Sequence, residues 1–252
     1  MTGLPGLFAL DGRVAIVTGA SSGIGRHMCR VLAEAGATVV AAARRESRLR
    51  ELSAADDRIV AVACDVTSSA DCARAVERAA DFGGPDVLVN AAGFGDPVPA
   101  LELQVEEFRR TLDVDLTGTF EMSAQAARAM RGRGGSIVNI ASILGLGASW
   151  PVSQAAYCAA KGGVVNLTRQ LGAEWADEGI RVNAIAPGWF PSELTEEMFA
   201  DGKAMRWLTR NTPMRRPGRL DELDGALLLL ASDAGAFITG QTIAVDGGWT
   251  AR

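Results

Sequence analysis

The chain has 252 residues, of which 48% are hydrophobic and 22% are charged, and its net charge is −5. This composition can bury a sizeable core and excludes a disordered chain, while an acidic balance without a long basic run argues against nucleic-acid binding. The apolar run at 226–231 is too short to cross a bilayer. Residues 1–10 lack the basic flank of a signal peptide, so no membrane association is predicted.

Four cysteines and one histidine limit the available chemistry. Cys29, Cys64, Cys72 and Cys158 form no Cys-x-x-Cys pair, which indicates a reducing compartment and predicts a cytoplasmic protein. His27 lies in the first predicted helix, where we interpret it as an incidental residue rather than a hydrolase base. Histidines and cysteines are also too sparse and too poorly spaced to predict a zinc site.

Short β-branched runs alternate with longer helical patterns along the whole chain. Strands are predicted at 13–19, 38–43, 58–64, 86–93, 135–142, 180–188 and 241–248. Helices are predicted at 24–36, 44–52, 69–83, 103–130, 153–179 and 220–232, with a looser helical region over about 192–210. The strands are continuous apolar runs, as is typical of strands buried on both faces. The pattern predicts one α/β domain over 1–252, a doubly wound, Rossmann-like parallel sheet with ligands at the carboxyl ends of its strands.

A glycine-rich loop, TGASSGIG at 18–25, follows the first predicted strand and opens the first helix. Gly19, Gly23 and Gly25 allow a tight turn and a close approach to a ligand. The N–H groups at a helix N-terminus suit a pyrophosphate, and the loop residues Ser21, Ser22 and Ile24 would share that contact. The spacing differs from the common G-x-G-x-x-G, and a glycine turn without a ligand is the alternative.

The tip of the second predicted strand bears on the choice of cofactor. A carboxylate there commonly holds the ribose 2′-OH of NAD, whereas an arginine accommodates the 2′-phosphate of NADP. Here Ala43 is followed by Arg44 and Arg45, with no acid at the tip. Arg44 comes first after the strand, so we expect it to contact the phosphate. NADP(H) is therefore favoured, with NAD(H) as the alternative.

Tyr157, the only tyrosine in the chain, lies four residues before Lys161 in a predicted helix. Residues at this spacing share one face of a helix. A nearby ammonium lowers the pKa of a tyrosine, and a tyrosine so tuned can exchange a proton with an alcohol or a developing alkoxide. Ser142 follows a predicted strand and could hydrogen-bond the same substrate oxygen. A surface tyrosine beside a surface lysine is the alternative.

Together these motifs resemble the short-chain dehydrogenase/reductase family, in its compact form without a separate substrate domain. The resemblance covers nearly the whole chain and extends to 3-oxoacyl-ACP reductases and related ketoreductases. It implies that Ser142, Tyr157 and Lys161 form a catalytic triad, with Lys161 also binding ribose hydroxyls. It further implies cofactor contacts from Asp65 and Val66 at the adenine, from Asn90, Ala91 and Gly93 in the NAAG motif, and from Pro187, Gly188 and Ser192 near the carboxamide.

One position departs from the family pattern. Where the family has an asparagine that helps a proton relay, this chain has Asp115, in the sequence VDLTG. An aspartate can accept hydrogen bonds but cannot donate an amide N–H, and its charge could stabilise Lys161 as a cation. The alternatives are a tolerated near-isostere and a relay with an altered pH dependence.

The substrate is expected to be a small carbonyl compound or secondary alcohol. Large apolar residues in the region 189–215 predict a lid over the site, which favours a β-ketoacyl chain or bulky ketone over a sugar or polyol. Trp150, in the segment between Ser142 and Tyr157, could point into the pocket or outward. By resemblance, the two long helices and the C-terminal segment imply a homotetramer, with a homodimer as the alternative.

Two other functions are compatible with nucleotide binding. A catalytically weak NADP(H) sensor or scaffold is supported only by Asp115, and the complete Ser–Tyr–Lys set argues against it. An epimerase or dehydratase of the extended relatives needs a further substrate domain, for which the roughly 65 residues after 188 leave little room.

Overall fold

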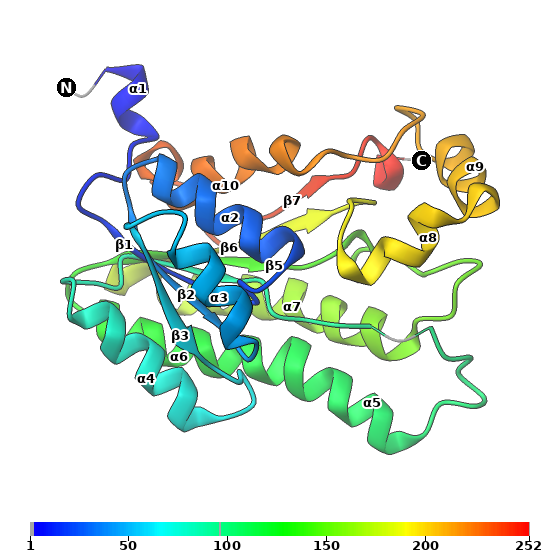
Figure 1. Cartoon of the computed structure of the whole chain (residues 1–252), viewed down its shortest axis with the longest axis horizontal. Coiled ribbons are helices and arrows are strands. Elements are labelled where there is room, and N and C mark those ends of the chain that lie inside the picture. The colour runs from blue at the N-terminus through cyan, green and yellow to red at the C-terminus, as the bar shows by residue number, and fades with distance from the viewer. Residues whose placement is uncertain (1–2, 96, 252) are drawn as a thin grey trace.

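The computed structural model describes residues 3–95 and 97–251, and its centre is a seven-stranded parallel sheet (Figure 1). The strands lie in the order β3-β2-β1-β4-β5-β6-β7. Their bounds are β1 Val14–Thr18, β2 Thr38–Ala43, β3 Ile59–Ala63, β4 Val87–Asn90, β5 Gly135–Ile140, β6 Ile180–Pro187 and β7 Thr242–Val245. The order reverses between β1 and β4, and such a switch point opens a crevice at the carboxyl ends of the strands. The doubly wound fold predicted from the sequence is confirmed.

Helices cover both faces of the sheet. One face packs against α2 (Gly23–Glu34), α3 (Glu46–Ser53) and α10 (Asp224–Ala231). The other packs against α4 (Ser69–Ala80), α6 (Gly118–Met130) and α7 (Ala155–Glu174), with α5 (Val105–Leu112) beside α7 (Figure 1). Three short helices complete the described chain: α1 (Leu4–Leu7), which the sequence did not predict, α8 (Glu196–Ala200) and α9 (Gly202–Asn211).

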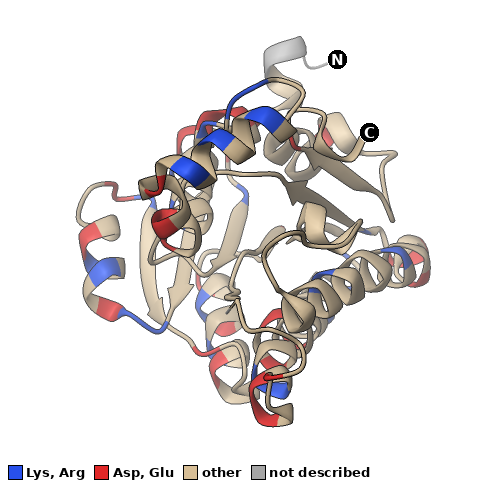
Figure 2. Cartoon of the chain, turned by 90° about the vertical axis from the view of Figure 1, so that its right-hand side faces the viewer, with Lys and Arg blue, Asp and Glu red and all other residues tan. Residues whose placement is uncertain are grey.

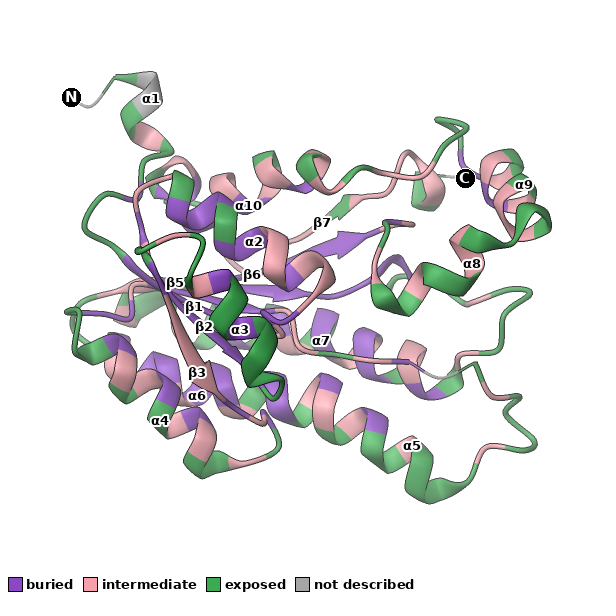
Figure 3. Cartoon of the chain, in the orientation of Figure 1, coloured by how far each residue is buried: buried purple, intermediate pink, exposed green. Residues whose placement is uncertain are grey.

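The five inner strands are buried because both of their faces are covered, whereas the edge strands β3 and β7 are mostly half-buried. In β1, Ala15 and Val17 belong to the core under α2, whereas Val14 and Ile16 belong to the core under α4 and α6. Figure 3 shows the strands largely buried, while the helices alternate buried and exposed positions. Figure 2 shows the acidic and basic residues mostly along the helices around the sheet. This separation explains why the strands are continuous apolar runs while the helices are amphipathic.

The long helix predicted at 103–130 is not one uninterrupted α-helix. A π-helical turn, Asp113–Thr117, joins α5 to α6 and contains Asp115. Such turns widen a helix by one residue and occur often at functional sites. The periodicity of apolar residues predicts the helix but not this local widening. In the described part of the chain, no helix combines the length and apolarity needed to cross a bilayer.

Candidate active site

The glycine loop connects β1 to α2 and lies against the end of β4. Gly19 has a φ of +65°, and a Cβ added there would lie 2.6 Å from the carbonyl oxygen of Ala91. Thr18 Oγ1 accepts hydrogen bonds from the backbone N–H groups of Ala91 and Ala92, at 3.1 and 3.2 Å. The loop and the NAAG motif are thus held together, as expected for segments that line one ligand site.

The N-terminus of α2 is suited to an anion. Its N-cap residue, Ser22, makes no side-chain hydrogen bond to the first turn. Gly25 brings the start of the helix onto the loop, since a Cβ there would lie 2.5 Å from the carbonyl oxygen of Gly19. Backbone N–H groups at a helix start held this close to the loop suit a pyrophosphate, and a side chain at Gly25 would push the helix away from the loop.

Buried amides support the centre of the sheet next to this loop. Asn90 at the end of β4 donates from Nδ2 to Asn139 Oδ1 in β5 and to Ser123 Oγ in α6, both at 2.9 Å. Asn139 in turn donates to Thr168 Oγ1 in α7 at 3.0 Å. Because buried polar groups are costly unless paired, this network fixes β4, β5 and both helices relative to one another. Asn90 therefore has a structural contact beneath the predicted cofactor site.

The four residues predicted to be catalytic come together from three elements. Ser142 lies two residues past β5, Tyr157 and Lys161 occupy the first turns of α7, and Asp115 lies in the π-helical turn. The Lys161 ammonium is 5.5 Å from the centre of the Tyr157 ring. Lys161 Nζ also donates to the carbonyl oxygen of Ile140 at 3.0 Å. Because Ile140 ends β5, this bond fixes the lysine at the carboxyl end of the sheet.

Asp115 forms a buried ion pair with the lysine. Its side chain is fully buried, and Oδ2 lies 3.3 Å from Lys161 Nζ. Its other oxygen, Oδ1, accepts a hydrogen bond from the backbone N–H of Phe94 at 2.9 Å. A Cβ at Gly93 would lie 2.8 Å from Asp115 Oδ2 and 3.2 Å from Lys161 Nζ. The glycine of the NAAG motif is therefore required for the pair to approach the backbone.

Burial and charge act on the pKa of each of these groups in opposite directions. Burial raises the pKa of Asp115, and the Lys161 charge only partly offsets it. For Lys161, burial lowers the pKa, but the charges of Asp115 and Tyr157 and the hydrogen bond to Asp115 together outweigh it, so the pKa is raised. Burial raises the pKa of Tyr157; the Lys161 charge lowers it, and the Asp115 charge raises it again. The expectation of a lowered tyrosine pKa is therefore wrong for this arrangement, because burial and Asp115 outweigh the lysine.

The two arginines after β2 have different surroundings. Arg44 is exposed and makes no hydrogen bond or ion pair with another described residue, although its charge helps to lower the pKa of Asp65. The larger effects on that carboxyl are the hydrogen bonds it accepts from the Thr67 N–H and hydroxyl, at 3.0 and 2.8 Å. Arg45, by contrast, reaches the glycine loop and Glu193. The sequence pattern predicts neither this role for Arg45 nor its contact with Glu193.

Val66 is buried beneath this region, against the start of α6. A Cβ at Gly118 would lie 2.8 Å from Val66 Cγ2, so this glycine allows the helix to pack closely on the segment after β3. The contact places Val66 and Asp65 at the carboxyl end of β3, on the same edge of the sheet as the glycine loop.

The segment after β6 approaches the glycine loop from the other side. Gly188 donates its N–H to the carbonyl oxygen of Val245 at 2.9 Å, which continues the pairing of β6 with β7 past Pro187. A Cβ at Gly23 would lie 3.3 Å from Ser192 Cβ. The three residues predicted to contact the carboxamide thus lie on a segment that reaches the predicted cofactor loop.

Three tryptophans pack the predicted lid against the segment near the C-terminus. Trp189 and Trp207 have ring centres 6.2 Å apart, and Trp249 lies 5.5 Å from each. Phe190 is buried in the main core. Much of the apolar area expected to face a substrate is therefore used in packing. Trp150 is 80% exposed, so it points outward.

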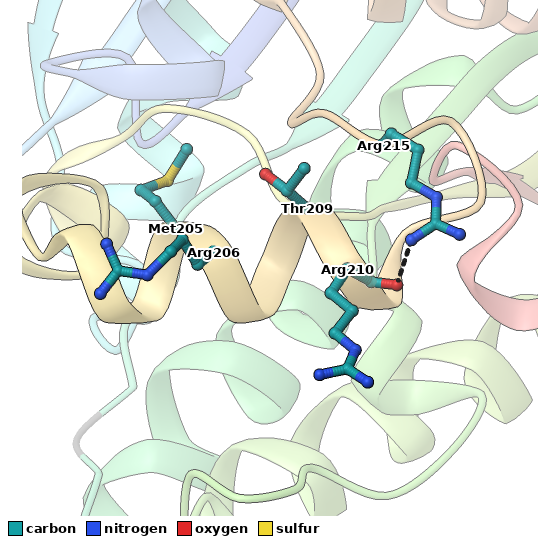
Figure 4. Close-up of a pocket in the computed structure, with 5 residues that line it drawn as sticks. All are labelled: Met205, Arg206, Thr209, Arg210 and Arg215. Carbon is teal, nitrogen blue, oxygen red and sulfur yellow. Dashed lines mark hydrogen bonds between the residues drawn. The ribbon is translucent and has the colours of Figure 1, made fainter.

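Two cavities lie in and beside the lid segment. One of about 490 Å³ lies along α9 and is lined by Met205, Arg206, Thr209, Arg210 and Arg215 (Figure 4). A second, of about 370 Å³, lies between Trp189 and the residues around Gly247. Neither is lined by the triad, so the candidate site is assigned from the side-chain geometry rather than from a cavity.

The single histidine lies outside this group. His27 Nε2 is 2.6 Å from Asp224 Oδ1, which links α2 to α10. Within residues 3–95 and 97–251, no group of three histidine, cysteine or acidic residues is placed to hold a metal ion.

Comparison with known proteins assigns the family. The family model described as enoyl-(acyl carrier protein) reductase matches residues 19–250. The chain belongs to the short-chain dehydrogenase/reductase family. It is an oxidoreductase, as the sequence predicted, and its relatives are named dehydrogenases.

Three relatives of this dehydrogenase illustrate the similarity. Cis-4-hydroxycyclohexanecarboxylate dehydrogenase of Sinomonas cyclohexanicum is 44% identical over 95% of this chain and 97% of its own length. Galactitol 2-dehydrogenase (L-tagatose-forming) of Cereibacter sphaeroides is 41% identical over 97% of both. The structure of a gluconate 5-dehydrogenase from Burkholderia cenocepacia, in complex with NADP and tartrate, is 36% identical with a TM-score of 0.93 over 99% of this chain and 100% of that one. These names favour the sugar or polyol alternative over the β-ketoacyl reading.

Proposed function

We propose that this dehydrogenase interconverts a secondary alcohol of a small polyol or hydroxy acid and the corresponding ketone, with NADP(H) as the favoured cofactor. The observation that carries the proposal is the assembly of Ser142, Tyr157 and Lys161 beside the glycine loop at one edge of the sheet. The substrate class comes from relatives that are named for galactitol, gluconate and hydroxycyclohexanecarboxylate.

The glycine loop and the segments around it suit a nicotinamide dinucleotide. The α2 N-terminus would take the pyrophosphate, Asp65 and Val66 would face the adenine, and Asn90, Ala91 and Gly93 would line the middle of the site. Pro187, Gly188 and Ser192 would face the carboxamide. When bound, the cofactor supplies the hydride acceptor or donor. The absence of an acid at the tip of β2, together with the free charge of Arg44, supports NADP(H) over NAD(H).

In this proposal Tyr157 exchanges the proton of the substrate oxygen, and Ser142 orients that oxygen. Because burial raises the pKa of Tyr157, the phenol is protonated near neutral pH and is ready to act as the acid in ketone reduction. Alcohol oxidation needs the phenolate and therefore becomes faster as the pH rises. Lys161 supplies positive charge beside the ring, and Asp115 positions and neutralises that lysine.

A β-ketoacyl chain or other partly apolar ketone is the second candidate substrate. The apolar residues of 189–215, which we propose act as a lid, favour it. Their packing into the tryptophan cluster leaves fewer of them for a substrate. The non-catalytic sensor remains supported only by Asp115. We propose a cytoplasmic homotetramer: the four cysteines form no Cys-x-x-Cys pair, which indicates a reducing compartment, and the family resemblance implies the tetramer.

The test is nucleotide absorbance over time with galactitol, threitol, gluconate and cis-4-hydroxycyclohexanecarboxylate, and in the reverse direction with a β-ketoester. Each is run with both cofactors. We expect turnover of at least one polyol or hydroxy acid, faster with NADP⁺ than with NAD⁺. Turnover of the ketoester alone would reverse the order of the two substrate classes. Nucleotide binding without any turnover would favour the sensor.

Tyr157→Phe tests the role of the phenol in the same assay. Removing a general acid or base typically slows turnover about 10²–10⁴-fold, and binding of the nucleotide should be retained. Cys158→Ala, a change on the next residue of the same helix, should keep most activity. Equal activity of Tyr157→Phe and the unmodified chain would contradict the assignment.

A further inference from the structure

The Arg45 guanidinium joins the glycine loop to the segment after β6. Its Nε and Nη2 donate to Ser21 Oγ at 3.1 and 2.9 Å, and Nη2 donates to Ser22 Oγ at 2.7 Å. The same guanidinium binds Glu193 through two atoms, Nη1 to Oε1 at 3.1 Å and Nη2 to Oε2 at 2.8 Å. A glutamate from the segment after β6 is therefore held at the glycine loop, 148 positions away from Arg45 in the chain.

This cluster lies where a 2′-phosphate would be recognised. In doubly wound folds the adenosine ribose lies between the glycine loop and the tip of the second strand. Arg45 follows that tip by two residues, and Ser21 and Ser22 belong to the loop. Hydroxyl groups and a planar guanidinium are donors that bind carboxylate and phosphate alike. The Glu193 carboxylate thus occupies donors that a phosphate at this position would need.

The ion pair is weak enough to be exchanged for another anion. The side chains of Arg45 and Glu193 are 48% and 46% exposed. Exposed ion pairs usually contribute about 0–1 kcal/mol of net free energy, and two-atom geometry places this pair toward the stronger end of that range. The hydrogen bonds from Arg45 nevertheless lower the pKa of Glu193. The carboxylate is therefore ionised at neutral pH and would repel a phosphate brought beside it.

We propose that Glu193 sets the cofactor preference by competing with the 2′-phosphate of NADP(H) for the Arg45 guanidinium, which also donates to Ser21 and Ser22. The inference rests on the proposed use of a nicotinamide cofactor and goes beyond it. NAD(H) binds with the Arg45–Glu193 contact intact, whereas NADP(H) binds only by displacing the glutamate. The charge of Arg44 attracts the phosphate, and Glu193 reduces that advantage.

Displacement of Glu193 also affects the predicted lid. Glu193 follows Ser192, which faces Gly23, and the chain continues directly into α8 and α9. When the contact with Arg45 breaks, the loop that leads into these helices is no longer fixed to Arg45 through Glu193. The choice of nucleotide and the position of this segment are linked through one carboxylate.

The experiment is calorimetric titration of the full chain with ADP-ribose and with 2′-phospho-ADP-ribose, which differ only in the phosphate and support no turnover. In Glu193→Gln we expect the dissociation constant of the 2′-phosphorylated ligand to fall about threefold to tenfold, because competition and repulsion are both removed. The dissociation constant of ADP-ribose should change less than twofold. Glu196→Gln is the matched control, since it removes the same charge from an exposed position three residues later with no described contact, and both constants should stay unchanged.

A second variant links the effect to the arginine. In an Arg45→Met background, Glu193→Gln should favour the phosphorylated ligand less than it does in the parent chain, because the competition for the arginine is already absent and only the repulsion is left to remove. Equal shifts for both ligands, no shift, or weaker binding of the phosphorylated ligand in Glu193→Gln would overturn the inference while leaving the proposed function in place. Failure of the unmodified chain to bind either ligand would overturn both.

Discussion

At the scale of single residues, the acid in place of the family asparagine changes the charge balance around Tyr157. Lys161 is the only cation within the triad, and part of its charge is neutralised by Asp115 at 3.3 Å. The tyrosine therefore experiences a buried pair rather than an isolated ammonium. Burial is the main reason that the pKa of Tyr157 is raised, and the Asp115 charge helps to offset the lysine one helical turn away.

The Asp115→Asn variant should shift the pH dependence of alcohol oxidation to lower pH. The Asp115 charge raises the pKa of Tyr157, so its removal lowers that pKa and the phenolate forms earlier as the pH rises. The measurement is kcat/KM against pH. Asp113→Asn, an exposed acid in the same π-helical turn, is the matched control and should leave the profile in place.

The opposite shift would show that the lysine itself had lost its proton. Without the Asp115 charge, burial of Lys161 is opposed less and the pKa of the lysine falls. If that fall carried the lysine to neutrality, the tyrosine pKa would rise instead. If the midpoint of the kcat/KM profile against pH stays as in the parent chain, Asp115 is a tolerated replacement for the family asparagine without electrostatic influence on the tyrosine.

At the scale of elements, the sequence predicts the strands best. The run TVVAAA becomes β2 over Thr38–Ala43 with the predicted bounds, because a strand buried on both faces is apolar throughout. The π-helical turn around Asp115 escaped prediction, since it alters hydrogen bonds without altering the apolar pattern. The Arg45–Glu193 contact escaped it too, because nothing in the pattern relates two charged residues 148 positions apart.

The site itself could be predicted in part. Tyr157 and Lys161 share a helix, so their spacing alone places them on one face. Ser142 comes from a separate element, but its place just after a predicted strand already suggested that it could share the substrate oxygen with Tyr157. Only the family resemblance linked Asp115 to that pair. The direction of the tyrosine pKa depended on burial, which the sequence does not provide.

The glycine loop yields a prediction that separates backbone strain from lack of space. Gly19 and Gly12 have similar φ values, +65° and +72°. A Cβ at Gly19 would meet the backbone of Ala91, whereas nothing lies within 4 Å of a Cβ at Gly12. Gly12→Ala should therefore cost about 1 kcal/mol of unfolding free energy, for the left-handed conformation alone. Gly19→Ala should cost about 2–4 kcal/mol, because strain and overpacking add.

Urea unfolding of both variants measures these costs, and nucleotide titration measures the effect on the site. Gly19→Ala should also weaken binding, since it pushes the loop away from the end of β4, while Gly12→Ala should bind as the parent chain does. Equal costs at the two positions would mean that the loop relaxes freely and that its contact with Ala91 is not restrictive.

At the scale of the whole molecule, the site draws on nearly the full length of the chain. The glycine loop follows β1, the triad comes from β5 and α7, and the segment with Ser192 follows β6. Their meeting point is the carboxyl edge of one sheet, whose order reverses beside β1. The match to relatives over 95% or more of their length agrees with a site that needs the complete sheet.

If the chain is one domain, as we propose, it should unfold in a single transition that nucleotide binding shifts as a unit. At a nucleotide concentration of about 100 times the dissociation constant, binding adds about 2.7 kcal/mol to stability. For a domain of this size that corresponds to a rise in Tm of about 5–10 °C. Calorimetry with increasing NADP⁺ measures this rise in Tm, with adenosine as a control ligand that lacks the pyrophosphate.

Two transitions, of which the nucleotide shifts the Tm of only one, would instead mean that the segment 189–215 or another part folds separately from the sheet. The same titration in Glu193→Gln should need less NADP⁺ for an equal rise, since the carboxylate that links the loops also opposes the phosphate.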